Sequence, residues 1–170
     1  MIDGTDKAAT ETTSVALRLT RRSAQSVPAD GVVRLTYDQR ARSRLRARLD
    51  DGREIGILLA RGENLRDRDL LASEDGTVIE VRAALESVST VLSDDSMSLA
   101  RAAYHLGNRH VALEIQPGRL RWLHDHVLDA MVQGLGLTVT REQAPFEPEP
   151  GAYGAIDGHV GGAHDHGHAH

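Results

Sequence analysis

The fold is decided by residues 85–141, which read LESVSTVLSDDSMSLARAAYHLGNRHVALEIQPGRLRWLHDHVLDAMVQGLGLTVTR. Apolar residues alternate with polar ones along 85–92, which predicts a strand, and then recur at helical spacing along 97–106, which predicts a helix. The pattern continues with strands at 110–115 and 119–124, a helix at 127–135 and a strand at about 137–141. This order, βαββαβ, predicts a ferredoxin-like sandwich.

Capping residues mark the ends of both predicted helices. Ser93-Asp94-Asp95 supplies an N-cap and first-turn acids for the first helix, and Asp125 supplies an N-cap for the second. Glycine is the usual residue where a helix ends in the left-handed conformation. We therefore expect Gly107 to close the first helix in that conformation, and Gly134 or Gly136 to end the second.

The two middle strands form a predicted hairpin about Pro117-Gly118, with Ile115 opposite Leu120. Carried along the strands, this register places Val111 across from a histidine and gathers three histidines at one end of the hairpin: His110, His124 and His126. Val111, Leu113 and Ile115 then face one side of the sheet, and His110, Ala112 and Glu114 face the other. If helices cover the first side, His110 lies on the open face or its edge, where subunits meet.

The first half of the chain reads as short strands joined by turns. Ser43–Leu49 alternates leucine and alanine with arginine, and Asp51-Gly52 offers a hairpin turn into Glu54–Leu59. A second turn, Asp75-Gly76, precedes a strand at Thr77–Ala83. These patterns predict a small all-β module.

The predicted class is α+β, with four segments along the chain. Residues 1–12 are small and polar and are expected to be disordered, and the β-rich domain follows at 13–84. The ferredoxin-like domain spans 85–143, and 144–170 is a Pro-, Gly- and acid-rich linker that carries a His-rich tail, also expected to be disordered.

Composition excludes several classes of protein. The chain has no cysteine, so disulfides, thiolate catalysis and cysteine metal sites are excluded. Its longest apolar run, Ile55–Ala60, is too short for a membrane span, and the start shows no signal pattern, so we expect a cytoplasmic protein. Nineteen of its 20 basic residues are arginine. Near-neutral local charge and the lack of interleaved aromatics favour a solvated strand face over a nucleic-acid site, and a peptide-binding surface stays open.

Histidine is strongly segregated: none of the nine precedes position 105, and five lie in the last 12 residues. Those five are His159, His164, His166, His168 and His170. Imidazole is a common ligand for divalent transition metals, and only nitrogen and oxygen donors are present, which suits Ni(II), Cu(II), Zn(II) or Co(II). Purification tags are usually contiguous histidine runs, whereas these are interleaved with Asp, Gly and Ala. The tail is therefore read as a native metal-binding segment.

Two-fold symmetry could bring two copies of His110 together and complete a metal site that one chain cannot fill. The alternative is a surface or capping histidine after a helix end. His124-Asp125-His126 has a spacing common in metal sites that also arises by chance, and His105 is read as structural because it falls in a last helical turn. The chain has no HExxH motif, which favours metal binding without catalysis over a metal-dependent hydrolase.

The sequence resembles the urease accessory protein UreE family over about residues 15–153. The motifs that carry the resemblance are YHLGNRHV at 104–111, QPG at 116–118, HDHVL at 124–128, LTVT at 137–140, PFEP at 145–148 and GAY at 151–153. GNRH is the most specific of them. Many relatives have proline where this chain has Ala112.

The resemblance implies a homodimeric nickel metallochaperone, not an enzyme, with a peptide-binding-like N-terminal domain and a ferredoxin-like metal domain that forms the dimer. It implies that His110 binds metal at the dimer interface with help from tail histidines, and that His124 and His126 bind further metal in some members. Nickel would pass through the GTPase UreG to the complex of urease apoprotein and accessory proteins. A general zinc or copper buffer would use the same residues, and no nucleic-acid or membrane partner is expected.

Overall fold

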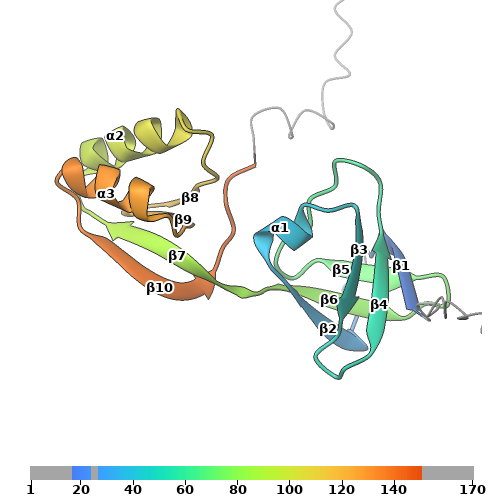
Figure 1. Cartoon of the computed structure of the whole chain (residues 1–170). Helices are drawn as coiled ribbons and strands as arrows, with labels where there is room; N and C mark the ends of the chain where they lie inside the picture. Colours follow the sequence, from blue (N-terminus) through green and yellow to red (C-terminus); the bar gives the residue numbers. More distant parts are fainter. Residues whose placement is uncertain (1–16, 24–26, 151–170) are drawn as a thin grey trace, which may run out of the picture. The chain divides into compact units, whose positions relative to one another are not determined.

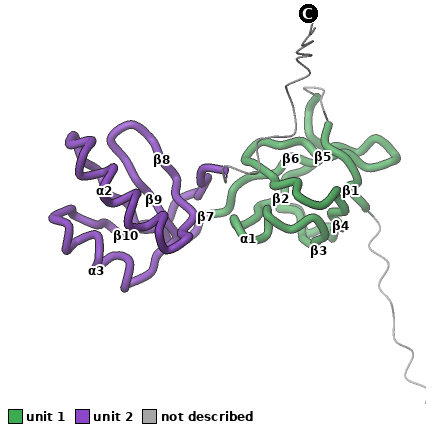
Figure 2. The backbone as a smooth tube through the Cα atoms, turned by 90° about the horizontal axis from the view of Figure 1, so that it is seen from above, with its two compact units in different colours: residues 1–84 green, residues 85–170 purple. Residues whose placement is uncertain are grey.

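The computed structural model describes residues 17–23 and 27–150. The chain divides into two compact units, residues 1–84 and 85–170 (Figure 2). The first is rich in strands and the second mixes strands and helices, so the chain has the predicted two-part α+β organisation. The expectations for residues 1–12 and for the His-bearing tail lie outside the described residues.

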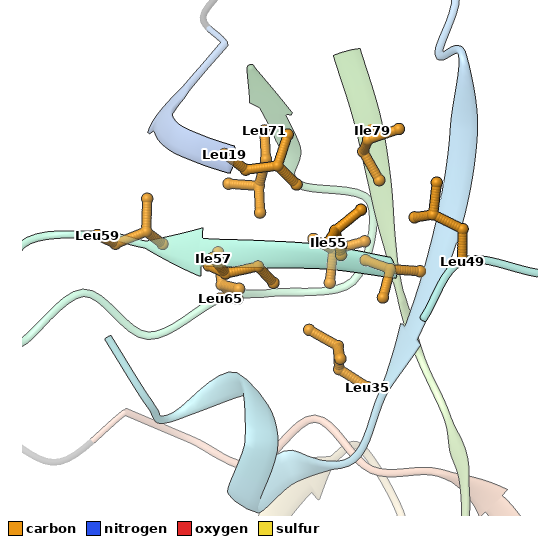
Figure 3. Packing of buried hydrophobic residues seen from close by; sticks show 11 residues of the cluster. Leu19, Leu35, Leu49, Ile55, Ile57, Leu59, Leu65, Leu71 and Ile79 are labelled. Atoms are coloured by element: carbon orange, nitrogen blue, oxygen red, sulfur yellow. The ribbon is translucent and has the colours of Figure 1, made fainter. Parts of the chain in front are cut away.

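The first unit is a six-stranded sheet in the order β2-β6-β5-β1-β4-β3. Its elements are β1 (Leu17–Arg22), β2 (Gly31–Leu35), α1 (Tyr37–Arg40), β3 (Arg44–Arg48), β4 (Glu54–Leu58), β5 (Leu70–Ser73) and β6 (Val78–Ala83). A bridge between Val33 and Leu49 joins the two outer edges, so the sheet curls around an aliphatic core (Figure 3). Leu19, Ile55, Ile57, Leu71 and Ile79 are fully buried in it.

Both turns predicted for this unit are confirmed. Gly52, between β3 and β4, and Gly76, between β5 and β6, each have a φ of +90°, a conformation that glycine adopts without steric cost. The short helix α1 was not predicted, although its signal is present in the sequence. Thr36 accepts a hydrogen bond from the Gln39 backbone N–H, and the Gln39 side chain accepts one from the Thr36 N–H, which is a capping box.

The second unit contains β7 (Leu85–Leu92), α2 (Ser96–Gly107), β8 (Glu114–Gln116), β9 (Arg119–Leu123), α3 (His126–Gly134) and β10 (Val139–Pro145). The strands form one antiparallel sheet in the order β10-β7-β9-β8, and both helices lie on the same side of it (Figure 1). Leu106, Leu120, Trp122 and Val132 are almost fully buried in the apolar cluster between helices and sheet. No helix among the described residues is long and apolar enough to cross a membrane.

The predicted helix starts are confirmed, and one predicted helix end is wrong. Asp95 caps α2 by accepting from the Met97 N–H, and Asp125 caps α3 by accepting from two backbone N–H groups. Gly136 follows α3 with a φ of +87°. Gly107, in contrast, is the last residue of α2, and it is His110 that has the positive φ, +55°. The left-handed residue at the end of α2 is therefore a histidine.

The strand expected at 110–115 is wrong for its first four residues, because β8 begins only at Glu114. The predicted register is confirmed where the strand exists, with Ile115 opposite Leu120. The linker expected from residue 144 also differs: β10 continues to Pro145, and Phe146 beyond it is fully buried. Cross-strand pairing with β7 holds this segment to the sheet as far as Pro145, despite its Pro-rich composition.

Candidate metal centre

His110 lies in the turn that ends α2, and backbone hydrogen bonds fix its position. The Val111 N–H donates to the Leu106 carbonyl at 3.3 Å, and the His110 N–H donates to the Gly107 carbonyl at 2.9 Å. These two hydrogen bonds, together with the left-handed conformation of His110, form a Schellman motif. Leu106 is fully buried and Val111 packs against the same apolar cluster, which is the hydrophobic contact that accompanies the motif.

Histidine is an unfavourable choice for this backbone position. The left-handed conformation costs a residue with a Cβ roughly 1–2 kcal/mol, and glycine pays no such cost. Gly107, only three residues earlier, lies inside the helix and has no positive φ, so its ability to adopt the left-handed conformation is not used. A strained non-glycine residue is an observation from which a functional hypothesis can be drawn. The presence of a histidine at this position therefore indicates a function for its side chain.

The imidazole of His110 is exposed, and within the described part of the chain it forms no hydrogen bond or ion pair. Both ring nitrogens are therefore accessible. Among residues 17–23 and 27–150 of one chain, no three His, Asp or Glu side chains are grouped to hold a metal ion. The expected gathering of His110, His124 and His126 at one hairpin end does not form such a group, because 110–113 are not part of the strand.

Apolar side chains surround a groove of about 400 Å³ between α2 and the β8–β9 turn. Its lining includes Leu99, Ala103, Ile115 and Leu120. Further exposed apolar side chains lie on α2 itself, where Met97 and Tyr104 are 61% and 65% exposed. The helix whose C-terminal end carries His110 thus also presents apolar surface.

His124, just after β9, is held by side chains. Its Nδ1 lies 3.0 Å from Asp129 Oδ2 and 3.1 Å from Ser89 Oγ. An ionised carboxylate only accepts, so the proton belongs on Nδ1, which leaves the Nε2 lone pair for a metal. Asp129 is itself oriented, because its other oxygen accepts from the Trp122 indole N–H at 3.1 Å.

Asp129 and Ser89 are residues that the sequence did not reveal as part of this arrangement. Asp129 is the acidic residue in the first turn of α3, a position that reads equally well as helix stabilisation. Ser89 is a buried hydroxyl in the middle of β7. Only the register of β7 against β9, in which Ser89 lies opposite Trp122, brings them together.

His126 is the first residue of α3 and is exposed, and Asp125 between the two histidines is engaged as the N-cap. The backbone N–H groups of Leu128 and Val127 lower the pKa of the Asp125 carboxyl, and the nearby histidines add to this effect. One oxygen of the carboxylate, Oδ1, is thus engaged at the N-terminus of the helix.

His105 lies in the last turn of α2, with its ring edge-on to that of Tyr104. The sequence suggested that its imidazole would serve the exposed carbonyl groups of the helix end. Among the described contacts, the Arg109 guanidinium donates to the His105 carbonyl at 3.1 Å.

Seven of the 14 arginines of the first unit form the ion pairs with carboxylates that follow. The pairs are Arg22 with Glu63 and Asp69, Arg34 with Asp50, Arg42 with Asp38, Arg48 with Glu54, Arg53 with Asp51, Arg68 with Asp67, and Arg82 with Asp67 and Glu80. Such pairing cancels much of the positive field that a phosphate backbone would need.

Comparison with known proteins accounts for nearly the whole chain. Residues 16–84 match the family model described as "UreE urease accessory protein, N-terminal domain", and residues 86–170 match the model described as "UreE urease accessory protein, C-terminal domain".

Full-length relatives agree with these matches. The urease accessory protein UreE of Alkalilimnicola ehrlichii is 62% identical over 138 residues, which cover 81% of this chain and 85% of the relative. The protein of the same name from Pseudomonas putida strain W619 is 61% identical over 136 residues, covering 79% and 84%. That of Aliivibrio fischeri strain MJ11 is 54% identical over 136 residues, covering 80% and 81%. The chain therefore belongs to the urease accessory protein UreE family.

Proposed function

We propose that this protein is a nickel metallochaperone that captures Ni(II) and delivers it for assembly of the urease active site. The observation that carries the proposal is His110, an exposed imidazole kept in a left-handed backbone position that glycine would fill more easily. In this proposal nickel is the cargo, and the protein catalyses no reaction of its own.

The tight site is shared between two chains. One His110 offers a single imidazole, which is too few donors for a divalent transition metal. A two-fold axis beside the end of α2 would double the donors and would also cover apolar surface from Met97, Tyr104 and the groove between α2 and β8. We therefore propose a homodimer formed through the second unit.

We assign the second unit to the ferredoxin-like fold. Its element order, βαββαβ, and its antiparallel sheet order, β10-β7-β9-β8, support this assignment, as does the position of both helices on one side. The fold matters for the function because it leaves the loop before β8, which carries His110, at the edge of the sheet.

The C-terminal histidines form the capture tier. His159, His164, His166, His168 and His170 raise the local concentration of nickel and supply additional imidazoles to the His110 site. Transfer to a partner requires exchange of ligands, so an incomplete site at His110 suits delivery better than a closed cage of four protein ligands.

His124 and His126 form a second, weaker candidate site. The Asp129–His124 contact supports it, because a metal-ligating histidine usually donates its other ring N–H to a carboxylate. His126 contributes an exposed imidazole two residues away.

The donor set does not select nickel by itself. Intrinsic affinity of nitrogen and oxygen ligands favours copper over nickel, so a zinc or copper buffer is the alternative to be tested. Membership of a urease accessory family favours nickel. We propose that the recipient is the GTPase UreG, acting in the cytoplasm within the complex of urease apoprotein and accessory proteins.

The test is a nickel titration by calorimetry, with mass determination, on three forms of the protein: the intact chain, the chain truncated after Gly158, and His110→Ala. Truncation should remove the weaker capacity and leave one tight site per dimer, and His110→Ala should remove the tight site. Tight binding that is unchanged in His110→Ala would exclude the interface site. Zinc and copper titrations of the intact chain, followed by transfer to urease apoprotein, separate a buffer from a nickel carrier.

A further inference from the structure

The segment that follows β10 crosses the face of the second-unit sheet that the helices leave open. We call residues 146–149 the strap. Thr90, Arg121 and Glu114 lie in one row across β7, β9 and β8. Their side chains point away from the helices, since the neighbouring Trp122 packs under the helices. The strap is held by this polar row.

Glu114 is the centre of the attachment. Its carboxylate accepts from Arg119 at 2.7 Å, from Arg121 at 3.4 Å and from the backbone N–H of Glu147 in the strap at 3.0 Å. Arg121 in turn donates to the Pro145 carbonyl at 3.3 Å, where the strap begins. The Glu114–Arg121 ion pair of the sheet therefore binds two backbone groups, the Pro145 carbonyl just before the strap and the Glu147 N–H within it.

This ion pair is shielded from water and supported from both sides. The Glu114 and Arg121 side chains are only 7% and 10% exposed. Arg121 also donates to Thr90 Oγ1 at 3.1 Å and to Glu142 Oε1 at 2.9 Å. The Thr90 hydroxyl and the Arg121 guanidinium together lower the pKa of the Glu142 carboxyl. Hydrogen bonds to charged groups are among the stronger hydrogen bonds in proteins, so these contacts hold the strap firmly against the sheet.

The strap ends beside the segment that carries His110. The Glu149 N–H donates to the Leu113 carbonyl at 2.7 Å. Leu113 is three positions beyond His110 in the sequence, which limits their Cα separation to about 11 Å. Without the strap the chain would leave the sheet at Pro145 on β10, three strands away from β8, or about 14 Å.

We propose that Glu114 and Arg121 are positioning residues that, through the strap, fix the start of the His-bearing C-terminal segment next to His110 of the same chain. This inference rests on the proposed function and adds a structural reason why tail imidazoles reach that site. Neither residue ligates the metal.

Chain statistics give the size of the effect. Counted from Glu149, the first tail histidine is 10 residues along the chain and the second 15, and counted from Pro145 they are 14 and 19 residues along. Moving the starting point to the far edge of the sheet lengthens both the chain and the span. The effective concentration of each tail imidazole at His110 then falls about threefold.

A proline substitution at Glu149 breaks the contact of the strap with the segment that carries His110, and it leaves Glu114 and Arg121 unchanged. Glu149→Pro removes the N–H that reaches Leu113, and it falls between two existing prolines, Pro148 and Pro150, where an extended backbone is already required. Glu149→Ala is the matched control, because it shortens the same exposed side chain and keeps the N–H. Phe146→Ala, which removes the buried aromatic anchor of the strap, is a second, independent way to release it.

Nickel affinity is measured by chelator competition for each variant, in the full chain and in the chain truncated after Gly158. We expect Glu149→Pro and Phe146→Ala to weaken nickel binding about threefold in the full chain, Glu149→Ala to leave it unchanged, and all three to have no effect after truncation. An equal loss with and without the tail would overturn the inference, since the strap would then act on the His110 segment itself.

A metal-free measurement tests the geometry directly. The chain has no cysteine, so Gly151→Cys provides a single site for a nitroxide label. We expect the label to broaden the amide signals of 111–113 strongly, and Glu149→Pro to reduce that broadening. Broadening confined to residues near Pro145 would overturn the inference.

The two proposals fail in different ways. If nickel affinity of the parent chain is the same with and without the tail, the capture tier of the proposed function is wrong and this inference falls with it. If nickel affinity depends on the tail but is unchanged by Glu149→Pro and by Phe146→Ala, only this inference is wrong.

Discussion

His110, after the end of α2, and His124, before α3, are held in position by different kinds of contact. His110 is fixed by backbone hydrogen bonds and a left-handed conformation, and its exposed ring contacts no polar partner in the described residues. His124 is about three-quarters buried, and its Nδ1 is bound to Ser89 and Asp129. One histidine is presented by the main chain, and the other is oriented by side chains.

The difference indicates how each site is completed. A ring oriented by a carboxylate is ready to ligate from one chain, with its tautomer already chosen. A ring with two accessible nitrogens on a strained turn gains its partners from elsewhere, which in the proposed function are a second chain and the tail. The comparison therefore predicts that the two sites respond to different substitutions.

The largest expected effect is that of His110→Gly. Losing the imidazole should weaken tight nickel binding by more than about a hundredfold, the upper end of what loss of a supporting residue costs. Folding should not suffer, because glycine relieves the left-handed strain, and the free energy of unfolding should stay within about 1 kcal/mol of the parent value or rise. Calorimetry and urea unfolding measure the two quantities on the same sample.

His110→Ala is the matched variant for that experiment. It removes the same imidazole but keeps a Cβ in the left-handed position, so it should lose nickel binding to the same extent while being less stable than His110→Gly by roughly 1 kcal/mol. If the glycine variant were the less stable of the two, the conformation described for the end of α2 would be wrong.

A smaller effect is expected from Asp129→Asn at the second site. The amide no longer holds the proton on His124 Nδ1 as a carboxylate does, so nickel affinity at His124 should fall 10- to 100-fold, the usual range for this kind of change. The His110 site should be unaffected. Resolved NMR shifts of the two imidazoles during a nickel titration distinguish the sites, and a loss at His110 instead would remove the distinction between them.

Two glycine substitutions test the helix ends themselves. Gly107→Ala should stabilise the protein by about 0.5–1 kcal/mol, because Gly107 is helical and a Cβ there meets no atom within 4 Å. Gly136→Ala should destabilise it by roughly 1–2 kcal/mol, because Gly136 has a φ of +87°. Thermal unfolding of both variants checks the signs, and a destabilising Gly107→Ala would restore Gly107 as the left-handed residue.

The smallest effect concerns acid stability at Glu142. Its pKa is lowered in the folded chain by Thr90 and Arg121, so the folded state binds fewer protons here than the unfolded state. The stabilisation is complete above the usual value of 4.5 and is lost as the pH falls through the lowered pKa. Because the side chain is 41% exposed, we expect less than about 1 kcal/mol.

Glu142→Gln is the variant for this measurement. Its stability should lie below that of the parent chain by a constant amount near neutral pH, and the two should converge below about pH 4.5 in urea unfolding followed over a pH series. A gap that widens in acid would have the wrong sign for a lowered pKa.

Local signals predicted most of the second-unit fold. Strand alternation, the Asp95 and Asp125 caps and the Pro117-Gly118 hairpin are each encoded within a few residues, and the Ile115–Leu120 register followed from them. The errors arose where residues distant in the sequence determine the local structure. β10 pairs with β7, a strand about 50 to 60 residues earlier, and Phe146 just beyond it is fully buried, so neither feature shows in the local Pro-rich composition, which read as linker.

The candidate site was predictable by residue type but not by geometry. The sequence singled out His110 from its motif, yet expected it in a strand because Val111, Leu113 and Ile115 alternate. That alternation is shared by an extended loop that packs Val111 and Leu113 on the apolar cluster without pairing to β9. Asp129 was not singled out, because only three-dimensional contact ties it to His124.

The turn that carries His110 separates the demands of folding from those of the metal binding proposed for it. Because glycine would serve the backbone there at least as well, folding alone gives no reason to keep a histidine at this position. We expect a chain with glycine at this position to remain folded. Screens for expression or thermal stability would pass such a variant, so the proposed role of His110 is tested only by an assay that supplies nickel.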